Sequence, residues 1–168
     1  EGIYFVTPTI VGWADLFTKQ AYWHIVLDAL AHYQQNNGLI IHAWCVMSSH
    51  LHLIISTSKS PLSDIMRDFK KYTSKRFTGS VKDGNDSRKE WLLRLFAEAG
   101  AELKRNINFK VWQDGNHPIL LDNNQMINER LDYLHNNPVE AGIVQDPTDY
   151  LLSSARDYAD EPGLLKIE

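Results

Sequence analysis

Residues 39–56 read LIIHAWCVMSSHLHLIIS, two apolar runs of strand length joined by a link of two serines. Side chains two positions apart in a strand share a face, so Leu51 and Leu53 are expected to enter the core together. A link as short as Ser48-Ser49 returns the second run antiparallel to the first. The stretch therefore predicts a β-hairpin formed by residues 39–47 and 50–56.

Strands and helices alternate on both sides of this hairpin. Extended segments are predicted at residues 3–11, 108–113 and 118–121, and segments with an apolar stripe of helical spacing at residues 15–37, 62–77, 87–104 and 124–137. Pro8 limits pairing inside the first strand, Asn37-Gly38 is a stop signal for the first helix, and Pro138 is expected to end the last helix. Residues 79–86 are predicted to form a polar loop.

The tail from about residue 145 is expected to be mostly irregular, and the chain shows no internal repeat or interdomain linker. Its 168 residues, 43% hydrophobic and 11% aromatic, suit one packed domain and argue against intrinsic disorder. We therefore predict an α+β fold in a single domain over residues 1–168.

Composition also excludes several classes of protein. Cys45 is the only cysteine, so an intramolecular disulfide and a zinc finger are excluded, and its apolar neighbours favour a core position. No apolar run approaches the roughly 18 residues of a membrane helix, and the first residues lack the pattern of a secretory signal. We expect a cytoplasmic protein with no membrane partner.

The charge is distributed unevenly along the chain. The formal net charge of -4 argues against a partner made of phosphates, but residues 59–110 hold 13 basic and 7 acidic residues, a balance of +6. The remainder holds 4 basic and 14 acidic residues, a balance of -10. A basic middle segment favours a polyanionic partner, although solvated helix faces give similar balances.

His50 and His52 form the sharpest local pattern. As residues i and i+2 of a predicted strand, they present two imidazoles to one point. Two imidazoles supply half of a metal site, and the alternative is a pair of histidines on the solvated face of a hairpin. The spacing alone leaves both interpretations open.

A second constellation lies in the last predicted helix, where Tyr133 and Asn137 are four residues apart and so share a face. A tyrosine in a helix usually serves packing. Taken together with His50 and His52, however, a divalent ion held by imidazoles and an amide oxygen would polarise a phosphodiester beside a phenolic nucleophile.

Residues 44–55, WCVMSSHLHLII, and residues 133–144, YLHNNPVEAGIV, resemble motifs of the HUH (His-hydrophobic-His) single-tyrosine transposases of bacterial insertion sequences. The asparagine-proline form of the tyrosine motif is most similar to that of the REP-associated tyrosine transposases. Further matches are residues 69–76, FKKYTSKR, residues 111–113, VWQ, and residues 153–158, SSARDY. The matches occur in family order over nearly the whole chain.

The resemblance implies a ferredoxin-like antiparallel sheet with helices packed mainly on one face. It implies a DNA transposase, a single-strand endonuclease and strand transferase that cleaves and rejoins DNA through a 5'-phosphotyrosine intermediate. His50 and His52 match the metal ligands and Tyr133 matches the nucleophile, with Mg2+ or Mn2+ as the divalent metal. Asn137 stands where other branches place a glutamine ligand, and Asn136 is the alternative because Pro138 follows directly.

The expected partner is single-stranded or hairpin DNA in the bacterial nucleoid. The basic residues that would neutralise its phosphates are Lys70, Lys71, Lys75 and Arg76. Tyr72 or Trp112 would stack on a base, with core packing as the alternative. Relatives act as monomers or with a site shared across a homodimer, and both states are open here.

Two other functions share these features. A replication-initiator-like HUH nickase has the same chemistry, but such enzymes commonly carry a second tyrosine on the same helix, and none accompanies Tyr133 at helical spacing. A domesticated DNA-binding protein would keep the site without turnover. Metal-dependent cleavage of single-stranded DNA separates that protein from a transposase.

Overall fold

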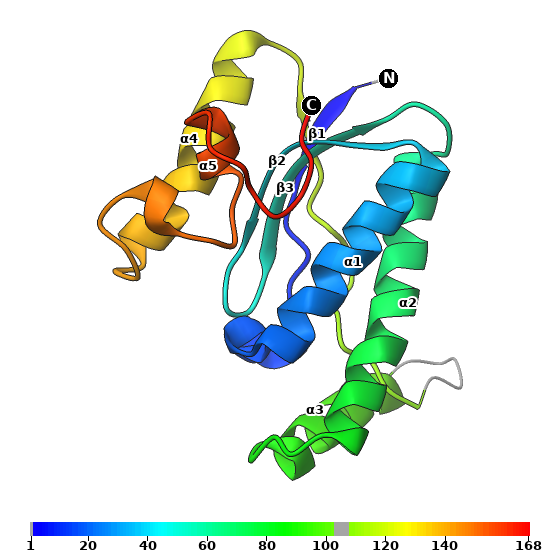
Figure 1. Ribbon diagram of the computed structural model, residues 1–168. Helices are drawn as coiled ribbons and strands as arrows, with labels where there is room; N and C mark the ends of the chain where they lie inside the picture. The colour runs from blue at the N-terminus through cyan, green and yellow to red at the C-terminus, as the bar shows by residue number, and fades with distance from the viewer. Residues whose placement is uncertain (1, 103–107) are drawn as a thin grey trace.

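The computed structural model describes residues 2–102 and 108–168, and Figure 1 shows the course of the chain. In these residues the elements are β1 (Ile3–Val6), η1 (Val11–Trp13), η2 (Leu16–Thr18), α1 (Gln20–Asn37), β2 (Leu39–Val46), β3 (Leu51–Thr57), α2 (Leu62–Asp83), α3 (Lys89–Ala101), β4 (Ile119–Leu121), α4 (Asn124–Glu140), η3 (Pro147–Asp149) and α5 (Ala155–Tyr158).

The four strands form one antiparallel sheet in the order β2-β3-β1-β4. The first strand is followed by a helix, then by the β2–β3 hairpin, and after α2 and α3 by the last strand, which is the succession of a ferredoxin-like fold. In the hairpin Trp44 pairs with Leu53 and Cys45 with His52, after a bulge between Ile41 and Ala43. The predicted hairpin and the α+β class are confirmed.

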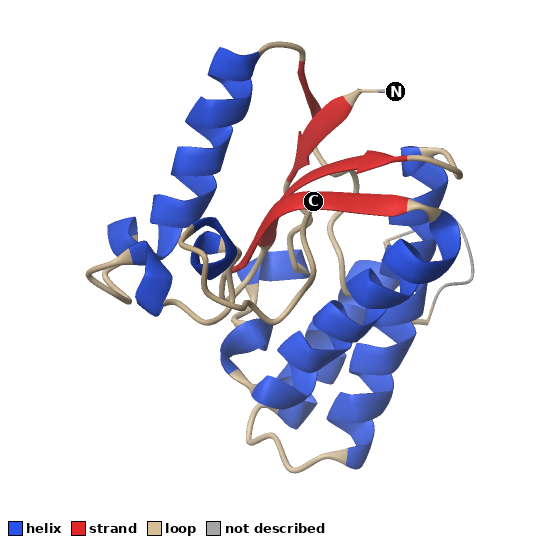
Figure 2. Ribbon diagram, turned by 45° about the horizontal axis from the view of Figure 1, so that its top comes forward, coloured by secondary structure: helices blue, strands red, loops and turns tan. Residues whose placement is uncertain are grey.

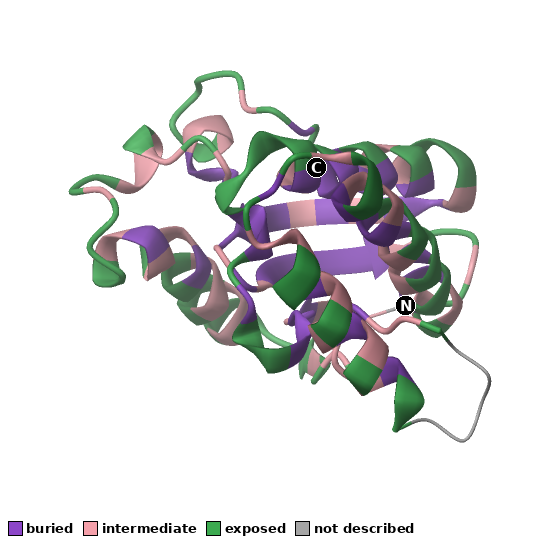
Figure 3. Cartoon of the chain, turned by 90° about the horizontal axis from the view of Figure 1, so that it is seen from below, coloured by how far each residue is buried: buried purple, intermediate pink, exposed green. Residues whose placement is uncertain are grey.

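The two faces of the sheet are covered unequally. The larger core cluster joins one face to α1, α2 and α3 through residues such as Leu53, Leu30 and Phe69. The smaller cluster joins the other face to α4 through Phe5, Ile54 and Leu134. Figure 2 shows α4 on the side of the sheet opposite α1 and α2, and Figure 3 shows buried strands between helices with exposed outer surfaces. Most of the helical mass therefore lies on one face, as predicted.

Several predicted boundaries differ from the structure. The helix predicted to end at residue 77 continues as α2 to Asp83, because Val81 extends the buried stripe into what the sequence suggested was a polar loop. Residues 16–18 form a 3-10 turn before α1 begins at Gln20. The strand predicted at residues 108–113 is wrong: Trp112 makes an isolated bridge with Ile10, and the Gln113 amide donates to the Thr9 carbonyl over 2.8 Å, but the segment forms no regular strand. Residues 103–107, at the end of the helix predicted at 87–104, lie outside the described residues.

Pro138 does not end α4, which continues to Glu140, so that prediction is wrong as well. Proline removes one helical hydrogen bond and its ring crowds the carbonyl four residues earlier, but here it lies in the last turn of α4, where it is buried. The Ala141 amide still donates to the Asn137 carbonyl over 2.9 Å. Tyr133 and Asn137 consequently lie on one regular helix.

The first predicted strand is interrupted as expected, since β1 ends before Pro8 and Thr9 and Ile10 make isolated bridges beyond it. At the other end of the chain, the tail runs along the outer edge of β2. The Val46 amide donates to the Leu152 carbonyl over 2.8 Å, and the Ser154 amide to the Trp44 carbonyl over 2.9 Å. Such a cover protects an edge strand from pairing with other chains. None of the helices in residues 2–102 and 108–168 is both long and apolar enough to cross a membrane.

Candidate metal and nucleophile site

His50 and His52 meet at the start of β3, where the alternation of the strand turns both rings to one face. Their Nε2 atoms lie 3.1 Å apart. His52 is almost fully buried, at 3% exposure, and His50 is half-buried. The predicted convergence of the two imidazoles on one point is present in the structure.

A hydroxyl group contacts the other ring nitrogen of each histidine. The His50 Nδ1 is 3.1 Å from Ser49 Oγ, and the His52 Nδ1 is 3.4 Å from Thr7 Oγ1. Burial lowers the pKa of His50, and burial, with the nearby His50 and Arg130, lowers the pKa of His52 to about 3. Both rings are therefore neutral near pH 7, which is the state that binds a metal ion.

Tyr133 stands on α4 directly beside this pair. Its ring centre is 5.3 Å from that of His52 and 6.1 Å from that of Phe5, both in edge contacts. The Tyr133 side chain is exposed, at 49%, so a ligand would reach it from solvent. The histidine pair and the tyrosine thus come together within one chain.

Arg130, one helical turn before Tyr133, is a site residue that the sequence did not reveal. Its guanidinium carbon lies 5.1 Å from the ring centre of Phe5 and 6.0 Å from that of Tyr133. The stacking on Phe5 holds a positive charge beside the phenol. The spacing of Arg130 and Tyr133, three residues apart on a helix, was the available signal.

The two asparagines before Pro138 differ in exposure. Asn137 is half-buried and lies four residues after Tyr133, whereas Asn136 is exposed. Within the part of the chain that the structure describes, no group of three His, Cys, Asp or Glu side chains could hold a metal. A third protein ligand drawn from the described residues would therefore have to be of another kind, such as an amide.

The predicted DNA-binding residues on α2 are not alike. Lys71, Lys75 and Arg76 are exposed, but the Lys70 ammonium donates to the carbonyls of Gln113 and Gly115 over 2.9 and 2.7 Å. Burial lowers the pKa of Lys70 to about 8. Because α2 and α4 cover opposite faces of the sheet, the structure does not bring these residues next to Tyr133.

Of the two aromatic residues predicted to stack on a base, Trp112 is buried at 3% exposure and its Nε1 donates to Thr73 Oγ1 over 2.8 Å. Core packing is therefore its role. Tyr72 is 44% exposed and accepts a hydrogen bond of 2.7 Å from Arg76. A different aromatic, Trp13, lies at the site: it is 61% exposed, and its ring centre is 5.7 Å from that of His50.

The structure places a histidine pair at the start of β3 beside a tyrosine on α4, on an antiparallel sheet. The sequence motifs that contain these three residues resemble those of transposases. Residues 14–136, more than half of the chain, match the family model of IS200-like transposases. The protein belongs to this family.

A solved structure of similar fold is that of a REP-associated tyrosine transposase bound to a REP hairpin. The similarity has a TM-score of 0.65 at 23% sequence identity, over 94% of this chain and 79% of the other. No curated protein matches the chain significantly.

Proposed function

We propose that this transposase cleaves and rejoins single-stranded DNA with Tyr133 as the nucleophile and a divalent metal ion held by His50 and His52. The observation that carries the proposal is the contact of the Tyr133 ring with His52, whose Nε2 lies 3.1 Å from that of His50. This contact supports a site in which the proposed nucleophile and the proposed metal ligands act on one phosphodiester. All three residues come from one chain.

The two Nε2 atoms lie 3.1 Å apart, so both imidazoles would hold one divalent ion together. The hydroxyls of Ser49 and Thr7 would fix the orientation of the rings from behind. We propose Mg2+ or Mn2+, which would polarise the phosphoryl oxygens as a Lewis acid when bound.

Asn137 is the better candidate for a third ligand. Relative to Tyr133 it turns toward the buried side of α4, where Leu134 and Pro138 pack, whereas Asn136 turns toward solvent. Its amide oxygen is also a harder ligand than imidazole and suits Mg2+ or Mn2+. Asn136 would serve only if the last turn of α4 rearranged.

In the proposed reaction the Tyr133 oxygen attacks the phosphorus of the scissile linkage. The bond from phosphorus to the 3' oxygen breaks, the phenol loses its proton, and the leaving 3' oxygen gains one. The products are a 5'-phosphotyrosine and a free 3'-hydroxyl, and the reverse attack by a 3'-hydroxyl rejoins a strand.

DNA binding is proposed from three observations. The chain belongs to a transposase family, the REP-associated transposase of similar fold was solved with a REP hairpin, and Lys71, Lys75 and Arg76 are exposed on α2. We propose that these three residues contact phosphates of a hairpin or its flank at a distance from the cleaved linkage. Lys70 would act by holding the loop at Gln113 and Gly115 rather than by binding phosphate.

The decisive experiment compares Tyr133→Phe with Tyr72→Phe, which changes a similarly exposed tyrosine on another helix. Each protein is incubated with Mn2+ and labelled single-stranded oligonucleotides that carry a hairpin, and covalent adducts are resolved on denaturing gels. We expect an adduct with the wild type and Tyr72→Phe, and none with Tyr133→Phe, which still binds the oligonucleotide.

An adduct that persists in Tyr133→Phe would contradict the assignment of the nucleophile. DNA binding by the wild type with no metal-dependent cleavage would contradict the enzyme and leave a DNA-binding protein of the same fold.

A further inference from the structure

Trp13 is the most exposed large apolar side chain in the described residues, and it lies against a proposed metal ligand. Its ring meets the ring of His50 edge-on, at 5.7 Å and 70°. The ring contacts across the site run in the order Tyr133, His52, His50, Trp13. Two exposed aromatic rings thus flank the histidine pair, one at each end.

The backbone of Trp13 is strained. Its φ is 54°, in the left-handed region that side chains other than glycine and asparagine rarely adopt, and the preceding Gly12 has a φ of 63°. Bulky residues keep such a conformation only when the surrounding structure imposes it, and such residues cluster at functional sites. The backbone that carries the indole is therefore fixed by its surroundings.

Hydrogen bonds fix both ends of this loop to the turn that precedes His50. The Ile10 amide donates to the Ser49 carbonyl over 2.9 Å, and the Phe17 amide donates to the Ser48 carbonyl over 2.9 Å. The Ser48 hydroxyl donates to the Asp15 carboxylate over 2.7 Å. Trp13 and His50 consequently belong to one hydrogen-bonded unit.

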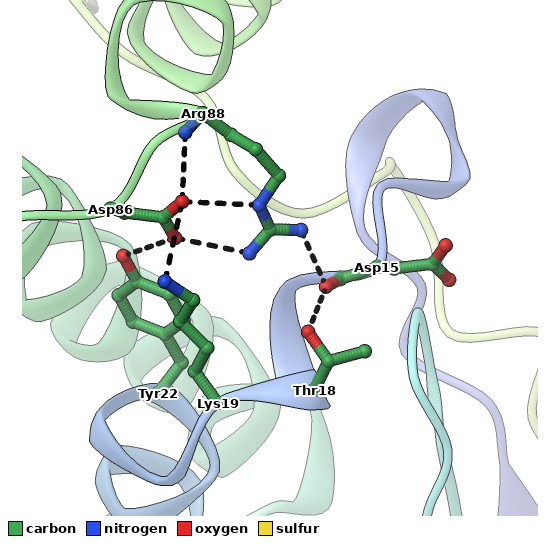
Figure 4. Close-up of polar contacts among 6 residues, drawn as sticks. All are labelled: Asp15, Thr18, Lys19, Tyr22, Asp86 and Arg88. Atoms are coloured by element: carbon green, nitrogen blue, oxygen red, sulfur yellow. Dashed lines mark hydrogen bonds and ion pairs between the residues drawn. The ribbon is translucent and has the colours of Figure 1, made fainter.

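A polar cluster around the buried Asp86 carboxylate, shown in Figure 4, supports the loop from the other side. The Asp86 carboxylate is 2% exposed and accepts hydrogen bonds from Tyr22 and Arg88. The Arg88 guanidinium also donates to the Asp15 carbonyl over 2.9 Å, and so does the Thr18 hydroxyl over 3.1 Å. We call the contacts of Asp15, Thr18, Lys19, Tyr22, Asp86 and Arg88 the Asp86 clamp.

We propose that Trp13 is a stacking platform for the base of the nucleotide that leaves with the 3'-hydroxyl, an inference that rests on the proposed function. In a phosphoryl transfer the attacking and leaving oxygens lie roughly in line, on opposite sides of the phosphorus. Tyr133 stands at the His52 end of the pair, so the leaving nucleotide lies at the His50 end, where Trp13 is exposed. An exposed, fixed indole stacks on any base, because every base has a π-face.

The experiment compares Trp13→Asn, which suits a positive φ and removes the ring, with Trp13→Phe, which keeps an aromatic ring. After the wild type has mapped the cleaved linkage, 2-aminopurine is placed on either side of it, and all variants carry Tyr133→Phe so that no strand is cut. We expect quenching of the fluorophore on the 3'-hydroxyl side with Trp13 and with Trp13→Phe, and its loss with Trp13→Asn.

Affinity supplies the second readout. Trp13→Asn is expected to weaken binding roughly five- to 150-fold, the effect of losing one base stack, and an abasic site at the same nucleotide is expected to erase the difference between the proteins. Equal quenching and affinity in Trp13→Asn, or quenching only on the tyrosine-linked side, would overturn the inference while the proposed function stands. A wild type that forms no adduct would overturn both. Trp13→Gly also permits the positive φ and removes the ring, so it replaces Trp13→Asn in these measurements if the asparagine variant does not fold.

Discussion

His50 and His52 belong to a hairpin with a nearly continuous buried strand, whereas Tyr133 stands on a helix with only two buried residues, Leu134 and Pro138, among its described positions. Around the histidines, polar contacts fix the turn and the Trp13 loop through the Asp86 clamp. Around the tyrosine, α4 packs on the smaller core cluster, and its outer residues face solvent. The histidine half of the candidate site, the proposed metal half, is thus packed and hydrogen-bonded more densely than the tyrosine half, the proposed nucleophile half.

The difference suits the proposed chemistry. Metal ligands lose affinity when their geometry is loose, so their support should be rigid. A tyrosine that becomes covalently attached to DNA has to move with the strand between cleavage and rejoining, and an element with little buried surface opens at lower free energy. The comparison can be tested by damaging each half in turn.

The largest effects are expected from two variants that distinguish metal binding from the cleavage reaction. His52→Ala should abolish the covalent adduct and weaken Mn2+ binding by at least about 100-fold, because the variant lacks a direct ligand. Tyr133→Phe should abolish the adduct with Mn2+ affinity unchanged. Isothermal titration with Mn2+ measures the affinity, and His24→Ala, an exposed histidine on α1, is the control. Unchanged Mn2+ affinity in His52→Ala would contradict the proposal that His52 is a metal ligand.

A smaller effect, a loss of stability, is expected when a substitution disrupts the Asp86 clamp. Asp86→Ala leaves Tyr22 and Arg88 without their buried acceptor, and we expect the free energy of unfolding to fall by about 3 kcal/mol. Asp64→Ala removes an exposed partner of Arg67 and should cost less than about 1 kcal/mol. Urea denaturation followed by circular dichroism measures both, and equal losses would show that the clamp does not stabilise the hairpin half.

The clamp also predicts how stability changes with pH. The Arg88 guanidinium holds the pKa of the Asp86 carboxyl well below its usual range. A depressed carboxyl pKa contributes stability that is fully present above the unfolded value of about 4 and is lost as pH falls toward the folded value. Wild-type stability should therefore decline below about pH 4, and Asp86→Asn should lack this part of the decline.

In the nucleophile half, Ser154→Ala should have a more local effect. The Ser154 hydroxyl accepts from the Trp44 amide over 3.0 Å and lies 2.8 Å from the His135 Nε2, which ties α4 to the tail and β2. Removing it should cost about 1–2 kcal/mol. Hydrogen exchange by mass spectrometry should show that Ser154→Ala increases the exchange rate more in α4 than in β3. An equal increase in both elements would mean that the two halves are not held independently.

The smallest effect, a change in DNA binding, is expected from substitutions on α2. Lys71→Ala combined with Lys75→Ala should weaken DNA binding for every sequence and lower the slope of log affinity against log salt by about 1 for each phosphate that the variant no longer neutralises. Lys70→Ala should leave that slope nearly unchanged, because Lys70 serves the loop at Gln113 and Gly115. Fluorescence anisotropy over a salt series measures the slopes, and a larger change for Lys70→Ala would reverse these roles.

Local rules explain what could be predicted. The period of two along a strand turned His50 and His52 to one face, and helical spacing placed Asn137 beside Tyr133 on α4. The prediction at Pro138 was wrong because the rule that proline ends a helix is weak in a last turn whose buried face is packed. Trp112 and Tyr72 were indistinguishable by pattern, because their exposures of 3% and 44% depend on which other elements pack over each ring.

By itself, then, the sequence predicted the hairpin, the α+β class and the shared face of the two histidines, because these follow from interactions between neighbours in the chain; the antiparallel sheet was implied only by the family resemblance. Only the tertiary structure decided that Tyr133 meets His52 within one chain and that Trp13 lies against His50. Both contacts join segments distant in sequence. The first depends on the packing of α4 against the smaller core cluster, and the second on hydrogen bonds that pin a strained loop to the turn before His50.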